Sequence, residues 1–428
     1  MSDEPSSYAK TVLDNGVRVI SEQLPGVRSV SMGVWVGVGS SHEEPQMRGI
    51  SHLIEHMLFK GTPTRSARQI AELMDSIGGN LNAFTDKEVT CYHGRVVDMQ
   101  AGLAFNVLSD MFRHAKFDPQ DLHNEQQVIL EEIRMYDDSP DEVSQDLFLR
   151  SVWAGSPLGE PTIGYAETVS AINRDAIAAY MAKRYTPDRV VVTAAGNVEH
   201  AELVKLVQAD LGSMHGRSIG DEPPRPVFRP AFTGRHKDCE QVYLLIGAEG
   251  TGANDDRRFA LSVLDAILGG GMASRLFQEI REKRGLVYSV YSAHNAYRNA
   301  GIFSVAASTG PKNAIEVVSL IRQELNRMAD DGVTPEELSR AKEHIKGNML
   351  LSLESTSTRM IRLGRSELNI GRHIPTAEIT ARIDAVTKDD VDGFARQLFG
   401  SGRLALTVLG PVDTQQIADA FETLPQSA

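Results

Sequence analysis

Three residues in one short stretch of the sequence have the types and the spacing of a metal site. His52 and His56 are four positions apart, and Glu55 stands between them. On a helix this spacing places the three side chains on one side, so two imidazole nitrogens and one carboxylate converge. Neutral imidazole is a common metal ligand, and a nearby carboxylate can accept a proton. The stretch therefore predicts metal-assisted chemistry.

The segment 49–61 is expected to form the helix that presents these side chains. It contains no proline, and its apolar residues Ile50, Leu53, Ile54 and Met57 recur at helical spacing. This apolar stripe would pack inward. The polar residues of the segment would then face away from the core.

A second helix is expected to supply a third ligand, because catalytic zinc usually has three protein ligands and one position for water. Asp118 and Pro119 have the residue types of a helix N-cap and first turn. Further along, Glu125 and Glu132 are seven residues apart and share a helix face. Glu131 points about 100° away from Glu132. Spacing alone leaves Glu131 and Glu132 both open as the third ligand.

The overall composition narrows the class of protein. The chain has 428 residues, 41% of them apolar, which is enough for two or three domains with real cores. Its formal charge of −13 argues against nucleic-acid or anionic-membrane binding, which needs a basic surface. The two cysteines, Cys91 and Cys239, exclude a disulfide framework and favour a reducing compartment.

The sequence shows no targeting or membrane-spanning segment. The N-terminus has no basic region followed by an apolar run. Nowhere does an apolar stretch approach the roughly 20 residues of a membrane helix. We therefore expect a cytoplasmic protein that binds neither membranes nor nucleic acid.

A faint internal repeat indicates a duplicated domain. Residues 189–198 parallel residues 403–412 at an offset of 214, and residues 117–122 resemble residues 333–338 at an offset of 216. Between the copies lies a proline-rich stretch that disfavours helices and central strands. We expect a first domain over 1–215 that carries the metal motif, a linker over 216–232 and a metal-free homologous domain over 233–428.

Each half is expected to mix strands with helices. Residues 30–38 alternate in the manner of a strand, and 190–195 and 404–409 are short apolar runs bounded by turn residues. Ser66 and Gln69 have the spacing of a capping box that opens a helix. The fold class is therefore α+β, with two homologous domains in tandem. Each is expected to be a mainly antiparallel sheet packed against helices.

The run from His52 to His56 is the His-x-x-Glu-His signature of the inverzincins. On this motif the chain resembles the pitrilysin/insulinase family of zinc peptidases. Within the family it is most similar to the branch of mitochondrial processing peptidase β-subunits and their bacterial single-chain relatives. The similarity extends over nearly the whole chain, from Leu13 to Val412. It implies an endopeptidase that cleaves peptides or unfolded segments, bound in extended form inside an enclosed cavity. Processing of targeting peptides is one activity found in this branch.

The resemblance also implies roles for residues around the motif. One Zn²⁺ per chain would be held by His52, His56 and Glu132, with Glu55 as the general base and Glu125 as a supporting residue. Substrate would pair along an edge strand at Asn82 and Ala83, and Phe59 would line a side-chain pocket. In the second half, Arg281 and Tyr288 would contact the substrate carbonyl and stabilise developing negative charge.

Two features bear on assembly and on alternatives. The second half has no metal motif, since Asn348 stands where the repeat would place Glu132. In this branch of the family two subunits enclose the cavity, so we expect a homodimer in which Arg281 and Tyr288 act across it. The competing interpretations are a non-catalytic core or scaffold subunit of the same fold, and a peptidase subunit that needs a different partner chain.

Overall fold

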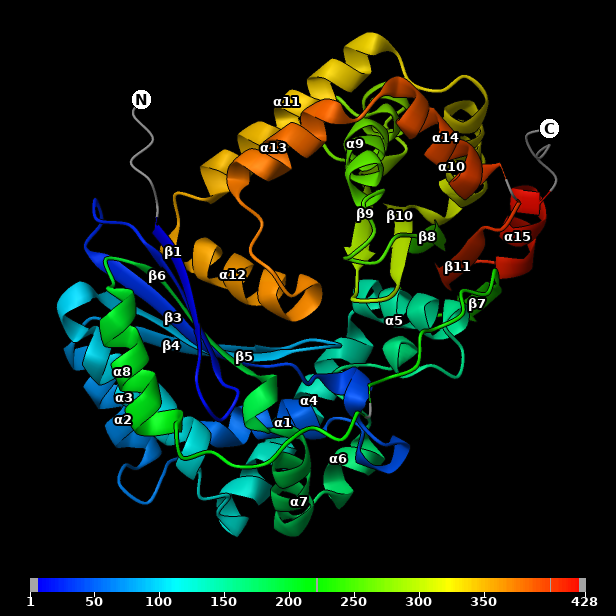
Figure 1. Ribbon diagram of the computed structural model, residues 1–428. Helices are drawn as coiled ribbons and strands as arrows, with labels where there is room; N and C mark the ends of the chain where they lie inside the picture. Colours follow the sequence, from blue (N-terminus) through cyan, green and yellow to red (C-terminus); the bar gives the residue numbers. More distant parts are fainter. Residues whose placement is uncertain (1–6, 221, 401, 423–428) are drawn as a thin grey trace. The chain divides into compact units, whose positions relative to one another are not determined.

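A computed structural model describes residues 7–220, 222–400 and 402–422 of the chain. The chain forms two compact units, and neither is one continuous stretch of sequence (Figure 1). The first unit takes in the chain up to Arg134, then Glu160–Pro223 and Ser352–His373. The second takes in Met135–Gly159, Pro224–Leu351 and the chain from Ile374 onward.

The first unit is built on a six-stranded sheet. Its strands lie in the order β1 (Ser7–Val12), β2 (Arg18–Gln23), β6 (Val190–Gly196), β3 (Ser29–Val36), β5 (Thr90–Val97) and β4 (Asn80–Thr85). All neighbours are antiparallel except β2 and β6, which are parallel. β4 is an edge strand, because it pairs with β5 alone among the described strands.

The second unit repeats this topology with five strands. Their order is β7 (Phe232–His236), β11 (Ala405–Gly410), β8 (Val242–Glu249), β10 (Gly301–Thr309) and β9 (Val287–Ala296). The pair β7–β11 is parallel and the others are antiparallel, as in the run β2-β6-β3-β5-β4. The repeated segments 189–198 and 403–412 contain β6 and β11, which occupy the same place in the two sheets. The predicted α+β class with two tandem homologous domains is confirmed.

Helices complete each unit. Those of the first unit are α1 (Ile50–Leu58), α2 (Ala67–Ser76), α3 (Ala101–His114), most of α4 (Pro119–Asp138), α6 (Ala166–Ala171), α7 (Arg174–Arg184), α8 (His200–Leu211) and α12 (Thr356–Ile370). Those of the second are α5 (Pro140–Val152), α9 (Arg258–Leu268), α10 (Ala314–Asp330), most of α11 (Pro335–Ser352), α13 (Thr376–Ala385), α14 (Lys388–Phe399) and α15 (Thr414–Glu422).

Two helices pack in a different unit from the segments that surround them in the sequence. α12 comes late in the chain but packs on the first sheet, where Met360 and Leu363 lie against Trp35 in one buried cluster. Gly364 is required there, because a Cβ on it would lie 2.2 Å from Cε2 of Trp35. α5 comes early but packs on β8 and β11 of the second sheet, with Phe148 against Gly247. The expected boundary at residue 215 therefore differs from the compact units in these two segments.

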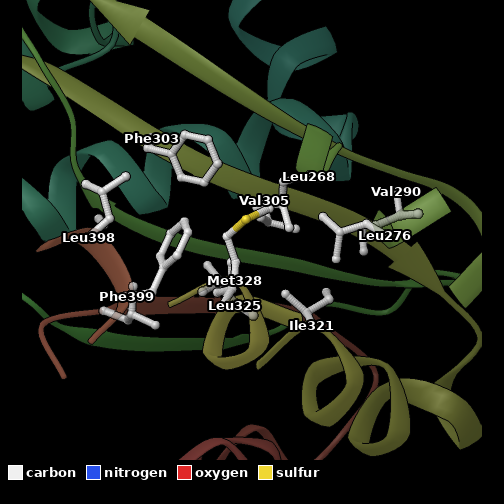
Figure 2. Close-up of a cluster of buried hydrophobic side chains, with 14 of the residues drawn as sticks. Leu268, Leu276, Val290, Phe303, Val305, Ile321, Leu325, Met328, Leu398 and Phe399 are labelled. Carbon is white, nitrogen blue, oxygen red and sulfur yellow. The ribbon is translucent and has the colours of Figure 1, made fainter. Parts of the chain in front are cut away.

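Each unit has its own hydrophobic core between its sheet and its helices. In the second unit, Ile321, Leu325 and Met328 of α10 point toward Phe303 of β10 and Phe399 of α14 (Figure 2). These side chains are at most 1% exposed. Burial of this kind contributes roughly 25 cal/mol per Å² of apolar surface, which makes it the main stabilising term for each unit.

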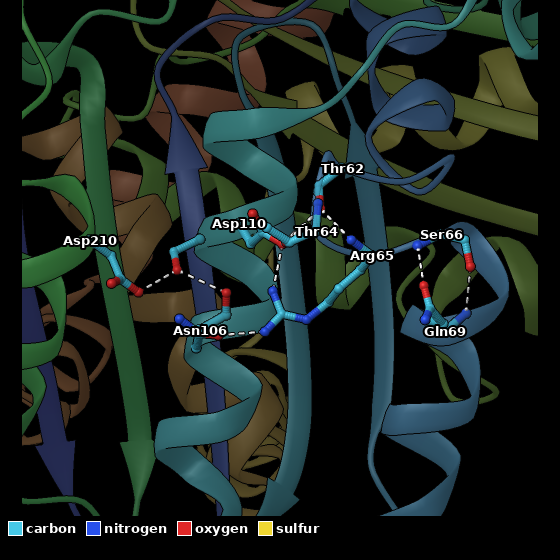
Figure 3. A network of polar contacts seen from close by, with 9 residues as sticks. Thr62, Thr64, Arg65, Ser66, Gln69, Asn106, Asp110 and Asp210 are labelled. Atoms are coloured by element: carbon cyan, nitrogen blue, oxygen red, sulfur yellow. Dashed lines mark hydrogen bonds and ion pairs between the residues drawn. The ribbon is translucent and has the colours of Figure 1, made fainter.

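A polar network fixes the loop that follows α1. The carboxylate of Asp110 on α3 accepts hydrogen bonds from Thr62 and Thr64 at 2.8 Å and from Arg65 at 2.5 Å (Figure 3). Burial raises the pKa of Asp110, but these three donors outweigh it and lower the pKa overall. Beside this network, Ser66 accepts the Gln69 N–H at 3.2 Å and Gln69 accepts the Ser66 N–H at 2.8 Å. The predicted capping box is confirmed.

Two further sequence predictions concern the linker and the N-terminus. Residues 216–231 contain no helix or strand among their described positions, whereas Phe232, the last residue of the expected linker 216–232, begins β7. The expectation that no targeting segment is present falls on residues 1–6, which lie outside the described residues. Over 7–220, 222–400 and 402–422, no helix has the length and apolar character needed to span a bilayer.

Candidate metal centre

The helix α1 carries the motif and is tied firmly to the core of the first unit. Ile50, Leu53, Ile54 and Met57 are completely buried, as their spacing predicts. The opposite side of the helix is partly exposed and bears the two histidines and Glu55. α1 begins after Gly49, whose φ of 92° is in the left-handed region that suits glycine.

A buried carboxylate holds the start of this helix. Glu43 accepts the N–H groups of Gly49 and Ser51, each at 2.8 Å. These donors belong to the helix end that lacks internal partners, so the carboxylate acts as a cap from outside the helix. Burial raises the pKa of Glu43 to about 7, against the opposing effect of the two backbone hydrogen bonds.

Three of the predicted side chains converge. One ligand atom each from His52, His56 and Glu132 lie within 4.8 Å of one another. Oε2 of Glu132 is 3.9 Å from Nε2 of His52 and 3.8 Å from Nε2 of His56. These distances are too long for hydrogen bonds but close to the about 3.4 Å that separates ligand atoms around tetrahedral zinc with bonds of 2.0–2.1 Å. The donor set of two imidazoles and one carboxylate therefore fits a zinc ion.

The structure distinguishes the two glutamates that helical spacing left open. Glu132 lies beside the histidines, whereas Glu131 is 67% exposed and forms an ion pair with Arg134 on the same helix. α4 is held in position by Gln126, which donates to the carbonyl oxygens of Val169 and Ile172 at 2.8 Å. Asp118 accepts the Gln120 N–H at 2.8 Å, as expected of a helix N-cap.

The two histidines are supported in different ways. Nδ1 of His56 lies 3.1 Å from Oε2 of Glu125, and Nζ of Lys60 lies 2.5 Å from the other oxygen of that carboxylate. A hydrogen bond from Nδ1 to Glu125 leaves the Nε2 lone pair of His56 facing Glu132. Burial, followed by the charge of His56, lowers the pKa of His52 to about 4, so His52 is neutral at pH 7.

Glu55 is placed beside the cluster by a hydrogen bond that the sequence did not reveal. Oγ1 of Thr85, the last residue of β4, donates to Oε2 of Glu55 at 2.5 Å. Burial raises the pKa of Glu55, while the Thr85 hydrogen bond and the charge of His56 act in the opposite direction. A half-buried carboxylate with a raised pKa is a more effective proton acceptor near neutral pH.

The remaining predicted residues of the first unit lie along β4 and at the end of α1. Asn82 is exposed on the edge strand β4, and its side-chain oxygen accepts the N–H of Ala83 at 2.8 Å. An edge strand offers backbone groups that can pair with another extended chain. Phe59 follows α1 directly and packs, partly buried, against the core of the unit.

Arg281 and Tyr288 lie together in the second unit. Arg281 is in the helical turn Phe277–Glu282, and its Cζ is 5.5 Å from the centre of the Tyr288 ring. Tyr288 is near the start of the edge strand β9 and is 78% exposed. The predicted pair is therefore adjacent, with an accessible phenol.

Comparison with known proteins identifies the class. Residues 18–165 match the family described as "Insulinase (Peptidase family M16)", and residues 171–345 match the "Peptidase M16 inactive domain". The chain belongs to the M16 peptidase family. The inactive-domain match excludes the segment with the histidine motif.

The chain is similar to named proteins over nearly its whole length. It is 44% identical to an uncharacterized zinc protease of Bacillus subtilis, covering 93% of this chain and 97% of that protein. It is 44% identical to an uncharacterized zinc protease of Mycobacterium leprae, covering 95% and 92% respectively.

Solved structures share the fold. A protease from Helicobacter pylori has a TM-score of 0.87 at 21% identity, covering 95% of this chain and 100% of that chain. A peptidase M16 inactive domain from Pseudomonas fluorescens has a TM-score of 0.88 at 18% identity, covering 94% and 98%.

Proposed function

We propose that the protein is a zinc-dependent endopeptidase that hydrolyses peptides or unfolded segments bound in extended form. The observation that carries the proposal is the convergence of His52, His56 and Glu132 around one point, with Glu55 beside them. The similarity to proteins named zinc proteases supports it. Removal of targeting peptides is one possible task for such an enzyme.

The chain's own residues would fill the protein roles that metal-assisted hydrolysis of a peptide bond requires. His52, His56 and Glu132 would hold the ion, which when bound supplies a Lewis acid that activates water and polarises a carbonyl. Glu55 would accept a proton from the attacking water and return it to the leaving amine. Thr85 would keep the Glu55 carboxylate aimed through its 2.5 Å hydrogen bond.

Glu125 is proposed as a positioning residue. Its carboxylate lies between Nδ1 of His56 and Nζ of Lys60, so it fixes the ring and favours the tautomer with a free Nε2. Replacement of such a partner typically reduces metal affinity about 10–100-fold.

The edge strand β4 is the proposed platform for substrate. An extended peptide could add to it at Asn82 and Ala83, on the strand whose last residue, Thr85, contacts Glu55. Folded proteins cannot offer a free strand, which would restrict cleavage to unfolded chains. Phe59, at the end of α1, would contact a substrate side chain.

Arg281 and Tyr288 are proposed to donate hydrogen bonds where negative charge develops on the scissile carbonyl, across a homodimer. Mixing chains that carry His52→Ala with chains that carry Tyr288→Phe, each inactive alone, tests action in trans. Recovery of up to about a quarter of the wild-type activity is expected for random pairing. Absence of recovery in heterodimers that are shown to form would contradict the assignment.

The decisive test is Glu55→Gln, with Glu131→Gln as the matched control. Both changes remove one negative charge near α1 and α4, but Glu131 is exposed and points away. Glu55→Gln should retain bound zinc and lose about 10²–10⁴-fold in peptide hydrolysis, while Glu131→Gln keeps both. Near-normal turnover by Glu55→Gln would refute the general-base role. Wild-type protein purified with no zinc and no chelator-sensitive activity would refute the function.

The alternative function, a non-catalytic core subunit, is supported only by similarity of fold. A chain in the structure of complex III from Candida albicans has a TM-score of 0.84 at 20% identity. Every proposed ligand position is filled in the present chain, which favours the enzyme. Peptidase activity of the purified single chain would also exclude a subunit that needs a different partner chain. Cell fractionation would test the expected cytoplasmic location.

A further inference from the structure

A cavity of about 410 Å³ lies in the second unit, and none of its lining residues belongs to the candidate metal centre. Its walls come from the start of β7, the start of β11, α10 and the end of α15, elements that are labelled in Figure 1. The strand walls are continuous, because β7 and β11 pair in parallel with Phe232 opposite Leu406. Its volume is in the range of pockets that hold small ligands.

Arg322 on α10 is an unusual lining residue for this cavity. Its neighbour Ile321 belongs to the apolar side of α10 that packs into the core (Figure 2). Arg322 is only 4% exposed, yet it has no hydrogen bond and no ion pair within the described parts of the chain, and its Nε is buried without a partner. Its guanidinium lies over the ring of Phe421, with Cζ 5.0 Å from the ring centre.

An isolated buried cation is costly for a folded protein. Desolvation is repaid only when a charged or polar partner is present. Arg275 in the same unit is an arginine with a full ion-pair partner. Its Nε and Nη2 each donate to a carboxylate oxygen of Glu337 at 2.7 Å. Arg322 lacks the carboxylate that Arg275 has.

We propose that this cavity binds a small monocarboxylate with an apolar body, whose carboxylate pairs with the guanidinium of Arg322. The planar fork of arginine matches a carboxylate with two parallel hydrogen bonds. Leu404, Leu406, Ala418 and Phe421 contribute the apolar part of a lining that is otherwise mostly polar, which suits a small carboxylate with a short apolar body.

The remaining lining selects for low charge. Glu422 is the acidic residue among the described residues that line the cavity. Glu422 is exposed and its charge balances that of Arg322, so a single carboxylate that reaches the guanidinium meets less repulsion than a phosphate or a dicarboxylate, which brings a second negative charge. Two sources share the required chemistry, a free branched-chain or aromatic acid and the C-terminal carboxylate of a peptide that ends in an apolar residue.

Isothermal titration of the full chain with 4-methylpentanoate tests the proposal, and its uncharged amide is the control ligand. N-acetyl-leucine represents a peptide C-terminus. Saturable binding of the acid is expected, with the amide about 10–100-fold weaker, because a hydrogen-bonded charge pair is lost. Binding of N-acetyl-leucine as tight as that of the free acid supports a peptide end as the source. Weaker binding supports the free acid, and both results support the carboxylate site.

Arg322→Met removes the charge and keeps an unbranched apolar side chain in the cavity. Arg327→Met is the matched control, because Arg327 is on the same helix but is 61% exposed and paired with Glu324. Only Arg322→Met should weaken binding of the acid, about tenfold or more. Its melting temperature should not fall, since no pairing within the described chain is lost, so loss of binding would not reflect unfolding.

Three results would overturn the proposal. They are the absence of saturable binding by the wild-type chain, equal binding of acid and amide, and equal affinity of Arg322→Met and wild type. The titration does not require bound zinc or peptidase activity, so its failure would leave the proposed function untouched.

Discussion

The two units share a five-strand order, but among the described residues only the first unit brings metal-ligating side chains together. In the first unit, α1 has a buried apolar face and an opposite face with His52, Glu55 and His56. In the second, α9 has the buried apolar face, but its sequence from Arg258 to Leu268 contains no histidine and no glutamate. The core therefore depends on one helix face and the candidate site on the other.

The second ligand helix shows the same contrast. The repeat places Asn348 of α11 where α4 has Glu132. The side chain of Asn348 instead makes a hydrogen bond of 3.0 Å with His344 on the exposed surface of the helix. A duplicated fold can thus lose a metal site without losing its core, because the site residues contribute little apolar burial.

The tryptophans make this comparison measurable. The sequence has two, and the buried Trp35 and Trp153 belong to the first and second unit respectively. A Trp153→Phe background leaves Trp35 as the fluorescence reporter of the first unit, and Trp35→Phe leaves Trp153 for the second. Each change below can therefore be assigned to one unit.

The largest effect is expected from His56→Ala, compared with His344→Ala on α11. His56→Ala should abolish stoichiometric zinc and reduce hydrolysis by on the order of a thousandfold, since several kcal/mol of charge stabilisation is lost. His344→Ala should keep about one zinc per chain and full activity. Metal analysis by plasma mass spectrometry and a fluorogenic peptide assay measure both. Loss of zinc from His344→Ala would contradict the claim that only the first unit holds the metal.

A smaller effect is expected from Glu43→Gln. At pH 5 the wild-type carboxyl is protonated, and its hydroxyl oxygen can still accept an N–H, which the amide nitrogen cannot. The first unit should therefore lose about 1 kcal/mol at pH 5. Because the pKa of Glu43 is raised from 4.5 to about 7, the folded chain binds this proton more tightly than the unfolded chain. That stabilisation is present below the unfolded pKa and is lost as pH rises through the folded pKa.

The difference between wild type and Glu43→Gln should therefore shrink between pH 4.5 and 7. Urea unfolding at pH 5, 6 and 7, followed by Trp35 fluorescence, measures it. A difference that grows with pH would show that Glu43 is ionised throughout this range and that its hydrogen bonds outweigh its burial.

The smallest effects are expected from the two capping boxes. Ser66 caps α2 in the first unit, and Thr387 caps α14 in the second through the Asp390 N–H. Ser66→Ala and Thr387→Ala should each cost about 1 kcal/mol, confined to the unit that contains the cap. Equal loss reported by Trp35 and Trp153 for either variant would mean that the units unfold together.

The sequence predicts much of this molecule because the relevant signals are local. The motif on α1, the Asp118 cap of α4 and the Ser66–Gln69 box depend on spacings of a few residues, and the structure has each of them. The duplicated topology was visible in the segments that became β6 and β11. Helical spacing alone did not separate Glu131 from Glu132, because that choice depends on where α4 lies relative to α1.

Contacts between distant positions could not be predicted. Thr85 meets Glu55 across 30 residues, and Glu43 reaches the start of α1 from an irregular segment with no helical or strand period. For Thr85, the one available signal was a hydroxyl at the end of a candidate edge strand. The exchange of α5 and α12 between the units left no local signal, since each helix has ordinary helical spacing.

That exchange of helices has a consequence for how the protein is made. The last strand of the first sheet, β6, ends at Gly196. One buried cluster on this sheet also needs Met360, Leu363 and Leu368 of α12, which come much later in the chain. On a ribosome that adds about 5–20 residues per second, the chain must grow by a further 170 residues or so before this helix emerges. The unit that bears the candidate zinc ligands therefore completes its packing only after α12 has been synthesised, long after the last strand of its sheet.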